Sequence, residues 1–481
     1  MDITQLQPAS VWHYFSQLCE IPRPSKHEQK LVAHILELAH DKNLEAFTDS
    51  AGNLIIRKPA SSGREEATSI VMQSHLDMVH QKNDDTNFDF ATQGIQMYVE
   101  GDWVKAKGTT LGADNGIGVA AIMSVLAADD MKHPAIEALF TIDEEVGMTG
   151  AMGVKKDFLT GSVLLNLDSE DDDALTIGSA GGVDVEIDGT YETTNISSEF
   201  TFFELIVKGL TGGHSGVDIH TGRSNAIKVL NRVLFELNKA FEVRIHSING
   251  GSLTNAIPRE CRAIIALKAD KTNDFEKALA RWNNQIKKEN DFSDPTLNIT
   301  VTETKNQSTV LTENFQKQLI ASLYTCPNGI YRMTPSLNNL VQTSNNLAKI
   351  TVENGVYKIC CHTRSFIESE RDDLVNVIRN SFLSIQATVT EVGPYPGWNP
   401  NPNTKTVATM KRIYKRLYGQ APDIFAIHAG LECGILAELY PNLEIISFGP
   451  NISGAHSPDE QLQISSTQKF WTYLTHVLAE I

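Results

Sequence analysis

The segment "SIVMQSHLDMV" at residues 69–79 decides the fold class, because it has the length and composition of a buried strand that ends in polar residues. Two further apolar runs, "IEALFTIDEE" at 136–145 and "SVLLNLDSE" at 162–170, also end in acidic residues. The helical stretch "GIGVAAIMSVLAA" at 116–128 lies between the first run and the second. Apolar strands interleaved with helices predict an α/β domain whose sheet is covered by helices on both faces.

The chain is long enough for two domains, since 481 residues exceed what one hydrophobic core usually serves. From about residue 186 the pattern changes to alternating strands such as "FTFFELIVKG", separated by amphipathic helices, which predicts an inserted α+β domain over 186–394. The stretch "GPYPGWNPNPNT" at 393–404 is rich in Pro, Gly and Asn and reads as a linker. We therefore expect the first domain to comprise 1–185 and 395–481.

Composition limits the partners and the compartment. The chain has 59 acidic and 41 basic residues, and its net charge of −18 repels nucleic acid and anionic membranes. Its six cysteines are scattered without a CxxC pair, which predicts reduced thiols rather than a disulfide framework. The first residues, "MDITQ", do not resemble a secretion signal, and no apolar run approaches the length of a membrane span. The sequence thus predicts a cytoplasmic protein that binds neither nucleic acid nor membrane.

Histidine and acidic side chains recur where the apolar runs end, which is where open α/β sheets bind ligands. Each of them alone also fits an ordinary surface or structural residue, and only the joint pattern favours a site. Two histidines with several carboxylates suit zinc, and two ions that share one carboxylate would use all of them. The candidates are His75 and Asp77, Asp114 in "GTTLGADNGIG", Glu144 and Glu145, Asp168, and His456 in "GPNISGAHSPDE".

These motifs resemble those of a known family, the dinuclear zinc peptidases that include peptidase T, carboxypeptidase G and the carnosinase-like dipeptidases. "SHLDMV", "GADNGIG", "DEEVGMTGA", "LLNLDSE" and "GAHSPDE" match the family's motifs in order, and "GLTGGHSG" resembles its middle-domain motif. The length of the inserted domain and the segment "HAGLECGI" are most similar to the aminoacyl-histidine dipeptidase branch. The resemblance implies a zinc-peptidase catalytic domain with an inserted lid and dimerisation domain.

The resemblance also implies which residues hold metal. His75 and Asp168 would bind one of two divalent ions. Glu145 and His456 would bind the other, and Asp114 would bridge the pair. Zinc is the expected metal, with cobalt or manganese as alternatives.

Two neighbours of these residues are expected to act without binding metal. By resemblance, Glu144 is the general base that deprotonates a metal-activated water. Asp77 lies two residues from His75 on the same face of the strand, so it can accept the imidazole N–H and orient the ring.

Three residues of the middle domain are implied to contact substrate. His214 in "GLTGGHSG" would stabilise the oxyanion, although a loop histidine without a role is the alternative. Asn255 and Arg364 would hold the substrate, with Arg364 binding a free carboxylate, and a structural hydrogen bond or salt bridge competes with each. The family also implies a homodimer formed through this domain.

The predicted activity is hydrolysis of unblocked dipeptides, preferentially Xaa-His dipeptides such as carnosine. In this family an aspartate at the position of Asp168 goes with dipeptidases and aminopeptidases, whereas a glutamate goes with carboxypeptidases. A tripeptidase or broad aminopeptidase is the main alternative. A non-catalytic relative that binds peptide or metal is a further one, although such a protein has no need of Glu144.

Overall fold

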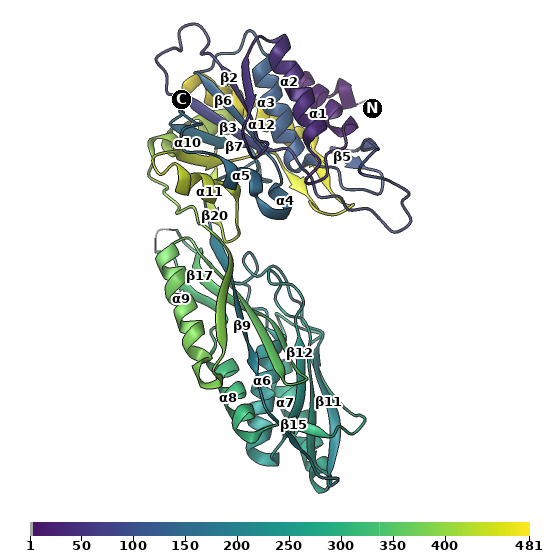
Figure 1. Ribbon diagram of the computed structural model, residues 1–481. Coiled ribbons are helices and arrows are strands. Elements are labelled where there is room, and N and C mark those ends of the chain that lie inside the picture. Colours follow the sequence, from purple (N-terminus) through teal and green to yellow (C-terminus); the bar gives the residue numbers. More distant parts are fainter. Residues whose placement is uncertain (1–2, 336) are drawn as a thin grey trace. The chain divides into compact units, whose positions relative to one another are not determined.

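The computed structural model describes residues 3–335 and 337–481, which divide into two compact units (Figure 1). The sequence placed the boundaries after residues 185 and 394, whereas the chain leaves the first unit at Gly178 and returns to it at Trp398. The short segment Ile427–Gly430 belongs to the second unit and had no signal in the sequence. The first unit comprises Met1–Gly178, Trp398–Ala426 and Leu431–Ile481, and the second comprises Ser179–Gly397 and Ile427–Gly430.

The first unit is built on an eight-stranded mixed sheet. In order across the sheet, its strands are β1 (Glu45–Thr48), β2 (Leu54–Lys58), β6 (Ile136–Thr141), β3 (Ile70–His75), β7 (Val163–Asn166), β21 (Glu444–Ser447), β8 (Ala174–Ser179) and β20 (Asp423–Ile427). Every residue of β3, β6 and β7 is buried, so both faces of the sheet are covered, as predicted. Because β3 pairs in parallel with both β6 and β7, these three strands end at the same edge of the sheet.

A smaller four-stranded sheet lies in the same unit. Its strands, in order, are β22 (Ile452–Ser453), β23 (Gln461–Gln463), β5 (Trp103–Ala106) and β4 (Met97–Glu100). All three of its pairings are antiparallel. The loop between β22 and β23 carries His456.

Helices cover the large sheet of the first unit. They are η1 (Ile3–Gln5), α1 (Ala9–Glu20), α2 (Gln29–Asp41), α3 (Ala113–Ala127), α4 (Glu144–Gly147), α5 (Thr149–Gly153), α10 (Lys405–Tyr418), α11 (Glu432–Leu439) and α12 (Ile464–Glu480). The central helix α3 is apolar on all sides, and it packs against β3 as well as against α1 and α2. The prolines of "IPRPS" separate α1 from α2, as expected. No helix in the described part of the chain is long and apolar enough to cross a membrane.

The second unit contains a nine-stranded antiparallel sheet. In order, its strands are β14 (Asn298–Glu303), β11 (Phe200–Lys208), β13 (Cys261–Lys268), β12 (Arg244–Gly250), β17 (Val341–Glu353), β18 (Val356–Ser365), β9 (Gly181–Thr190) and β19 (Thr388–Tyr395), with β16 (Gly329–Met333) paired to β17. A separate pair joins β10 (Thr193–Asn195) to β15 (Thr309–Leu311). Along β9, Val183, Val185 and Ile187 enter the core, while the acidic residues between them face outward.

Four α-helices contribute side chains to the core of the second unit. The helices are α6 (Ala226–Phe241), α7 (Thr272–Glu289), α8 (Glu313–Thr325) and α9 (Glu368–Ser381), with short 3-10 turns η2 (Ala269–Lys271) and η3 (Leu383–Ile385). Their apolar positions form one continuous cluster with the inward-facing residues of the sheet. This arrangement is the α+β architecture that the alternating strands predicted.

The second unit repeats one pattern of elements twice. The first half runs β11, α6, β12, β13, α7, β14, which is the βαββαβ order of ferredoxin-like folds. The second half runs β9, α8, β17, β18, α9, β19, with the first half inserted after its first strand. The second strands of the two halves, β12 and β17, pair antiparallel and join the halves into one sheet.

Candidate metal centre

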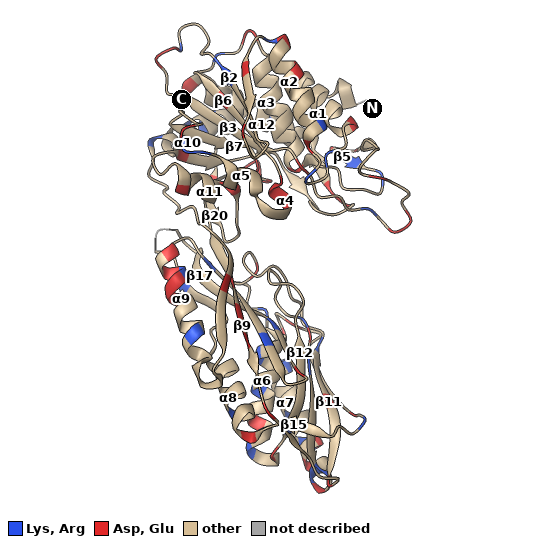
Figure 2. Cartoon of the chain, in the orientation of Figure 1, with Lys and Arg blue, Asp and Glu red and all other residues tan. Residues whose placement is uncertain are grey.

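Three parallel strands bring most of the predicted site residues to one edge of the sheet. His75 is the last residue of β3, Asp168 follows β7 by two residues, and Glu144 and Glu145 open α4 just after β6. The acidic start of α4 is visible as a red segment in Figure 2. Asp114 joins them from the first turn of α3. The spacing of strand ends in the sequence therefore corresponds to neighbours in space.

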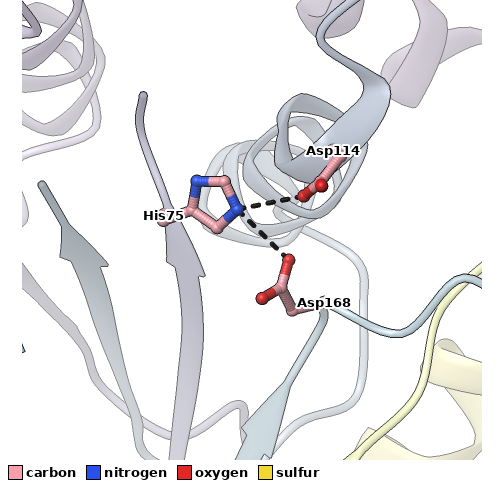
Figure 3. Close-up of side chains that lie close together, drawn as sticks. All are labelled: His75, Asp114 and Asp168. Atoms are coloured by element: carbon pink, nitrogen blue, oxygen red, sulfur yellow. Dashed lines mark hydrogen bonds and ion pairs between the residues drawn. The ribbon is translucent and has the colours of Figure 1, made fainter. Parts of the chain in front are cut away.

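His75 lies between two carboxylates (Figure 3). Its Nε2 is 3.0 Å from Oδ1 of Asp114 and 3.4 Å from Oδ1 of Asp168. The histidine is buried, and Asp168 Oδ1 has no hydrogen-bond partner among the described residues. One imidazole N–H cannot serve two carboxylates at once, so a cation between the three groups accounts better for their approach.

A second group forms around the other oxygen of Asp114. His456 Nε2 lies 3.1 Å from Asp114 Oδ2 and 3.0 Å from Glu145 Oε2. Glu145 Oε1 is buried without a hydrogen-bond partner in residues 3–335 and 337–481. Each oxygen of Asp114 thus faces a different histidine, an arrangement in which one carboxylate could contact two ions.

The candidate ligand atoms are close enough to hold metal ions. Within the groups His75, Asp114, Asp168 and Asp114, Glu145, His456, the nitrogen and oxygen atoms lie within 4.8 Å of one another. His75 forms a further such group with Glu144 and Glu145. Histidine nitrogens combined with carboxylate oxygens are the donor set of borderline metals such as zinc. The residues present thus fit two divalent ions.

The pKa values reflect the crowding of charge. Burial raises the pKa of Asp168 to about 6 and holds the pKa of Glu144 well above its usual range. Hydrogen bonds with Asp114 and Glu145 raise the pKa of His456 to about 11. Several carboxylates packed away from water are therefore ionised together only when positive charge lies beside them, and protonated histidines or bound cations can supply that charge.

Asp77 is fully buried and accepts hydrogen bonds from several neighbours. Its carboxylate accepts the Ser25 hydroxyl at 2.8 Å and the backbone N–H groups of Glu144 and Glu145 at 3.0 and 3.2 Å. It also lies 3.4 Å from Nδ1 of His75, the nitrogen that faces away from Asp114. Burial would raise the pKa of Asp77, but the adjacent His75 and the groups that donate to its carboxylate lower it to about 2. Asp77 therefore links the histidine to the glutamate pair.

Two charged residues that the sequence reading missed hold the loops of the site. The buried Arg23 guanidinium donates to the carbonyls of Leu76, Asp77 and Gly112. The Glu460 carboxylate accepts four backbone N–H groups of residues 111–114. Arg23 lies in "IPRPS" and Glu460 ends "GAHSPDE". For both residues, the signal in the sequence is a charged side chain within a loop motif.

In the second unit, His214 and Arg364 lie together. His214 Nδ1 accepts the backbone N–H groups of Gly216 and Val217, so the proton of the neutral ring is on Nε2. Burial and the charge of Arg364 lower the pKa of His214 to about 4, which keeps the ring neutral. Arg364 Nη2 is 3.4 Å from that Nε2.

Arg364 is only 4% exposed, yet its guanidinium contacts neutral groups. It donates to the Tyr395 hydroxyl at 2.8 Å and the Ser215 hydroxyl at 3.3 Å. Its Nε has no hydrogen-bond partner within the described part of the chain. Asn255 is exposed, and its backbone carbonyl accepts the N–H of Ser215 on the loop that carries His214.

Comparison with known proteins identifies the family. Residues 205–294 match the model of the M20 peptidase dimerisation domain. The chain is 40% identical over 481 residues to the cytosol non-specific dipeptidase of Escherichia coli, covering 100% of this chain and 99% of that protein. The crystal structure of aminoacylhistidine dipeptidase from Vibrio alginolyticus matches with a TM-score of 0.93 and 40% identity, over 100% of this chain and 98% of that one.

A more distant match supports the fold alone. The crystal structure of aminopeptidase PepT from Bacillus cereus has a TM-score of 0.58 at 15% identity, over 99% of both chains. The full-length identity to the Escherichia coli and Vibrio alginolyticus proteins is what decides the family. This chain belongs to the M20 family of metallopeptidases.

Proposed function

We propose that this protein is a metal-dependent dipeptidase that hydrolyses unblocked dipeptides, with a preference for Xaa-His. The observation that carries the proposal is the cluster of two histidines and four carboxylates at the strand ends, with Asp114 between the two histidines. Full-length similarity to proteins named as a non-specific dipeptidase and an aminoacylhistidine dipeptidase supports the substrate class.

We assign the ligands from the two groups around Asp114. His75 and Asp168 would hold one ion, and Glu145 and His456 would hold the other, with Asp114 shared. Zinc suits this donor set, and cobalt or manganese could replace it. Asp77 would orient His75 through Nδ1, which fixes the tautomer of the ring.

Glu144 is the proposed general base. Two bound metal ions would supply an activated water and polarise the peptide carbonyl. Glu144 opens α4 beside Glu145, and its raised pKa suits a group that takes a proton from water and returns it to the leaving amine. The neighbouring carboxylate of Glu145 is engaged with His456, which leaves Glu144 free for proton transfer.

Residues of the second unit would bind the substrate ends. The Nε2–H of neutral His214 is a suitable donor to the oxyanion. The buried guanidinium of Arg364 has neutral partners, so it is poised to pair with the free carboxylate of a dipeptide. Asn255, on the neighbouring loop, would hold the substrate backbone.

The proposed setting is a cytoplasmic homodimer that acts on peptides and binds neither nucleic acid nor membrane. The six cysteines are free, and the Escherichia coli relative is named a cytosol dipeptidase. The match to a dimerisation domain supports self-association. Light scattering after size-exclusion chromatography would test it, with a mass of about 53 kDa arguing against the dimer.

The central test separates metal binding from proton transfer. Glu144→Gln should keep both metal ions, measured by elemental analysis, while kcat falls by about 10³-fold because no base deprotonates the water. His75→Ala and Asp114→Ala should lose metal. Glu137→Ala is the matched control, because Glu137 is a buried glutamate at the opposite end of β6. Turnover retained by Glu144→Gln would show that the base is wrongly assigned.

A peptide panel tests the substrate class. Carnosine, other dipeptides and tripeptides would be assayed with zinc, cobalt and manganese after removal of metal by a chelator. Rapid cleavage of dipeptides, with Xaa-His preferred, is expected. Faster cleavage of tripeptides would favour a tripeptidase, and metal binding without any hydrolysis would favour a non-catalytic relative.

A further inference from the structure

A buried glutamate outside the proposed ligand set lies behind the metal centre. Glu432 is the first residue of α11, in the segment "HAGLECGI", and its side chain is only 1% exposed. It is close enough for its charge to contribute to the raised pKa values of Glu144 and Cys433. Carboxylates this deep are rare unless they are paired or serve a site.

Hydrogen bonds connect Glu432 to the central strands. Its Oε2 accepts Gln73 Nε2 and Thr141 Oγ1, each at 2.7 Å. The other end of the Gln73 amide, Oε1, accepts Asn166 Nδ2 at 2.5 Å. One polar chain, made of Asn166, Gln73, Glu432 and Thr141, thus crosses three strands inside the core.

The strand register relates this chain to the metal ligands. Gln73 pairs with Asn166 across β3 and β7, and His75 pairs with Thr141 across β3 and β6. Gln73 is two residues before His75 on β3, so both side chains are on the same face of the sheet. Asn166 is likewise the last residue of β7, two positions before Asp168. Gln73 and Asn166 of the polar chain therefore each lie two positions before a proposed metal ligand.

The third strand leads to the glutamate pair. Thr141 ends β6, and Glu144 and Glu145 follow three and four residues later. Each of the three strands that the polar chain connects thus continues into a residue of the centre. A shift of one strand end would move its ligand relative to the other two.

The carboxylate is costly where it lies. Glu432 Oε1 is buried without a hydrogen-bond partner in the described residues, and burial raises the pKa of the group to about 8. Joining a helix to a sheet requires no titratable group, since apolar contacts do so at lower cost. Gln73 and Thr141 require a polar acceptor at this position, a role that apolar packing would not fill.

We propose that Glu432 is a positioning residue of the metal centre, which fixes the three ligand-bearing strand ends through Gln73, Thr141 and Asn166. The inference rests on the proposed metallopeptidase function, since it assumes that His75, Asp168 and the glutamate pair serve two metal ions.

The test measures metal affinity as well as activity. In Glu432→Ala, Gln73 and Thr141 lose their shared acceptor, so the metal dissociation constant should rise and kcat should fall, each by about tenfold or more. KM for a dipeptide should change by less than about twofold, because Glu432 does not contact substrate. Glu432→Gln keeps an oxygen that can accept both bonds and should stay within about threefold of the parent protein.

Glu137→Ala serves as the matched control. Glu137 is also a buried glutamate, at the start of β6, and it accepts the backbone N–H groups of Thr160 and Gly161. Its removal should lower the unfolding temperature without weakening metal binding. The comparison thereby separates a general loss of stability, which both variants would show, from a displaced metal centre, which only Glu432→Ala should show.

Three outcomes would overturn the proposal. The first is a folded Glu432→Ala protein that binds zinc as tightly as the parent. The second is an equal loss of zinc affinity in Glu137→Ala. If Glu432→Ala does not fold, Thr141→Val removes one donor to Glu432 and one acceptor of Gln73 Nε2 at nearly constant shape, and unchanged zinc affinity in that variant would be the third. If the parent protein binds zinc and cleaves dipeptides and Glu432→Ala does so equally well, this inference alone is refuted. If the parent protein binds no metal, the proposed function is refuted as well.

Discussion

Asp77 is proposed to organise the metal centre without binding metal itself. Its carboxylate accepts the Ser25 hydroxyl and the N–H groups of Glu144 and Glu145, and it lies 3.4 Å from His75. Asp77→Ala would leave these donors without their acceptor and free the imidazole to rotate. We expect kcat and metal affinity to fall by about 10–100-fold, as measured by steady-state kinetics and metal titration.

The control for this variant is Asp41→Ala, because Asp41 is highly exposed at the end of α2, where it lies beside His40. That change should alter neither quantity. Metal binding as tight in Asp77→Ala as in the parent protein would remove Asp77 from the centre.

Individual residues differ in how readily the sequence discloses them. His75, Asp114 and Asp168 could be proposed from the sequence because their residue types occur where apolar runs or glycine turns end. Glu432 could not be proposed from the sequence, because its partners Gln73 and Thr141 lie 359 and 291 positions earlier in the chain. Residue type and local spacing carry no information on such a pairing, which arises only when the sheet assembles.

At the level of elements, Glu460 attaches the β22–β23 loop to the start of α3. The carboxylate accepts the backbone N–H groups of Leu111, Gly112 and Ala113 at 2.7–3.0 Å and that of Asp114 at 3.3 Å. In Glu460→Gln an amide NH₂ would face some of these donors. We expect a loss of about 1–3 kcal/mol in the free energy of unfolding of the metal-free protein, measured with urea.

Metal affinity should fall in the same variant, because Asp114 is among the residues whose N–H groups lose an acceptor. Glu100→Gln, a change at an exposed position of β4, is the control. Parent-like stability together with parent-like metal affinity in Glu460→Gln would contradict the role of this carboxylate.

Elements with a strong hydrophobic pattern were predictable, and weakly patterned ones were not. Helices α6, α7 and α10 match the amphipathic stretches of the sequence, and β3, β6 and β7 match its apolar runs. Strands β1 and β4 have no fully buried position, so no apolar run marks them. Their existence depends on pairing with β2 and β5, which only the folded chain supplies.

At the scale of the whole molecule, the duplicated pattern of the second unit bears on self-association. The match to a dimerisation domain covers residues 205–294, within the first half. Of the two edge strands of that half, β12 is paired with β17 of the second half, whereas β14 lies at the outer edge of the nine-stranded sheet. A second copy of the chain therefore cannot pair with β12, whereas β14 and the surfaces beside it are available to it, a distinction that the sequence pattern did not reveal.

In the proposed function the first unit binds metal and residues of the second unit bind substrate, and this assignment can be tested at Arg364. Arg364 is 4% exposed and its guanidinium hydrogen-bonds to neutral partners, with Asp184 acting on it only through its charge, so a bound anion would offset the cost of burying this cation. The free carboxylate of a dipeptide is such an anion. The proposed metal ligands all belong to the first unit, so loss of this side chain should leave metal content unchanged.

Arg364→Ala should therefore lower kcat/KM for a dipeptide by about 100-fold or more, because a charge-assisted bidentate contact is lost. The corresponding dipeptide amide lacks the carboxylate, so its slower hydrolysis should change by less than about threefold. Arg371→Ala is the control, because Arg371 also bonds to Tyr395 but pairs with Asp372 rather than awaiting an anion. Equal losses on the dipeptide and its amide would mean that Arg364 supports the fold of the second unit, not recognition of the carboxylate. A fall in metal content would contradict the assignment of metal binding to the first unit alone.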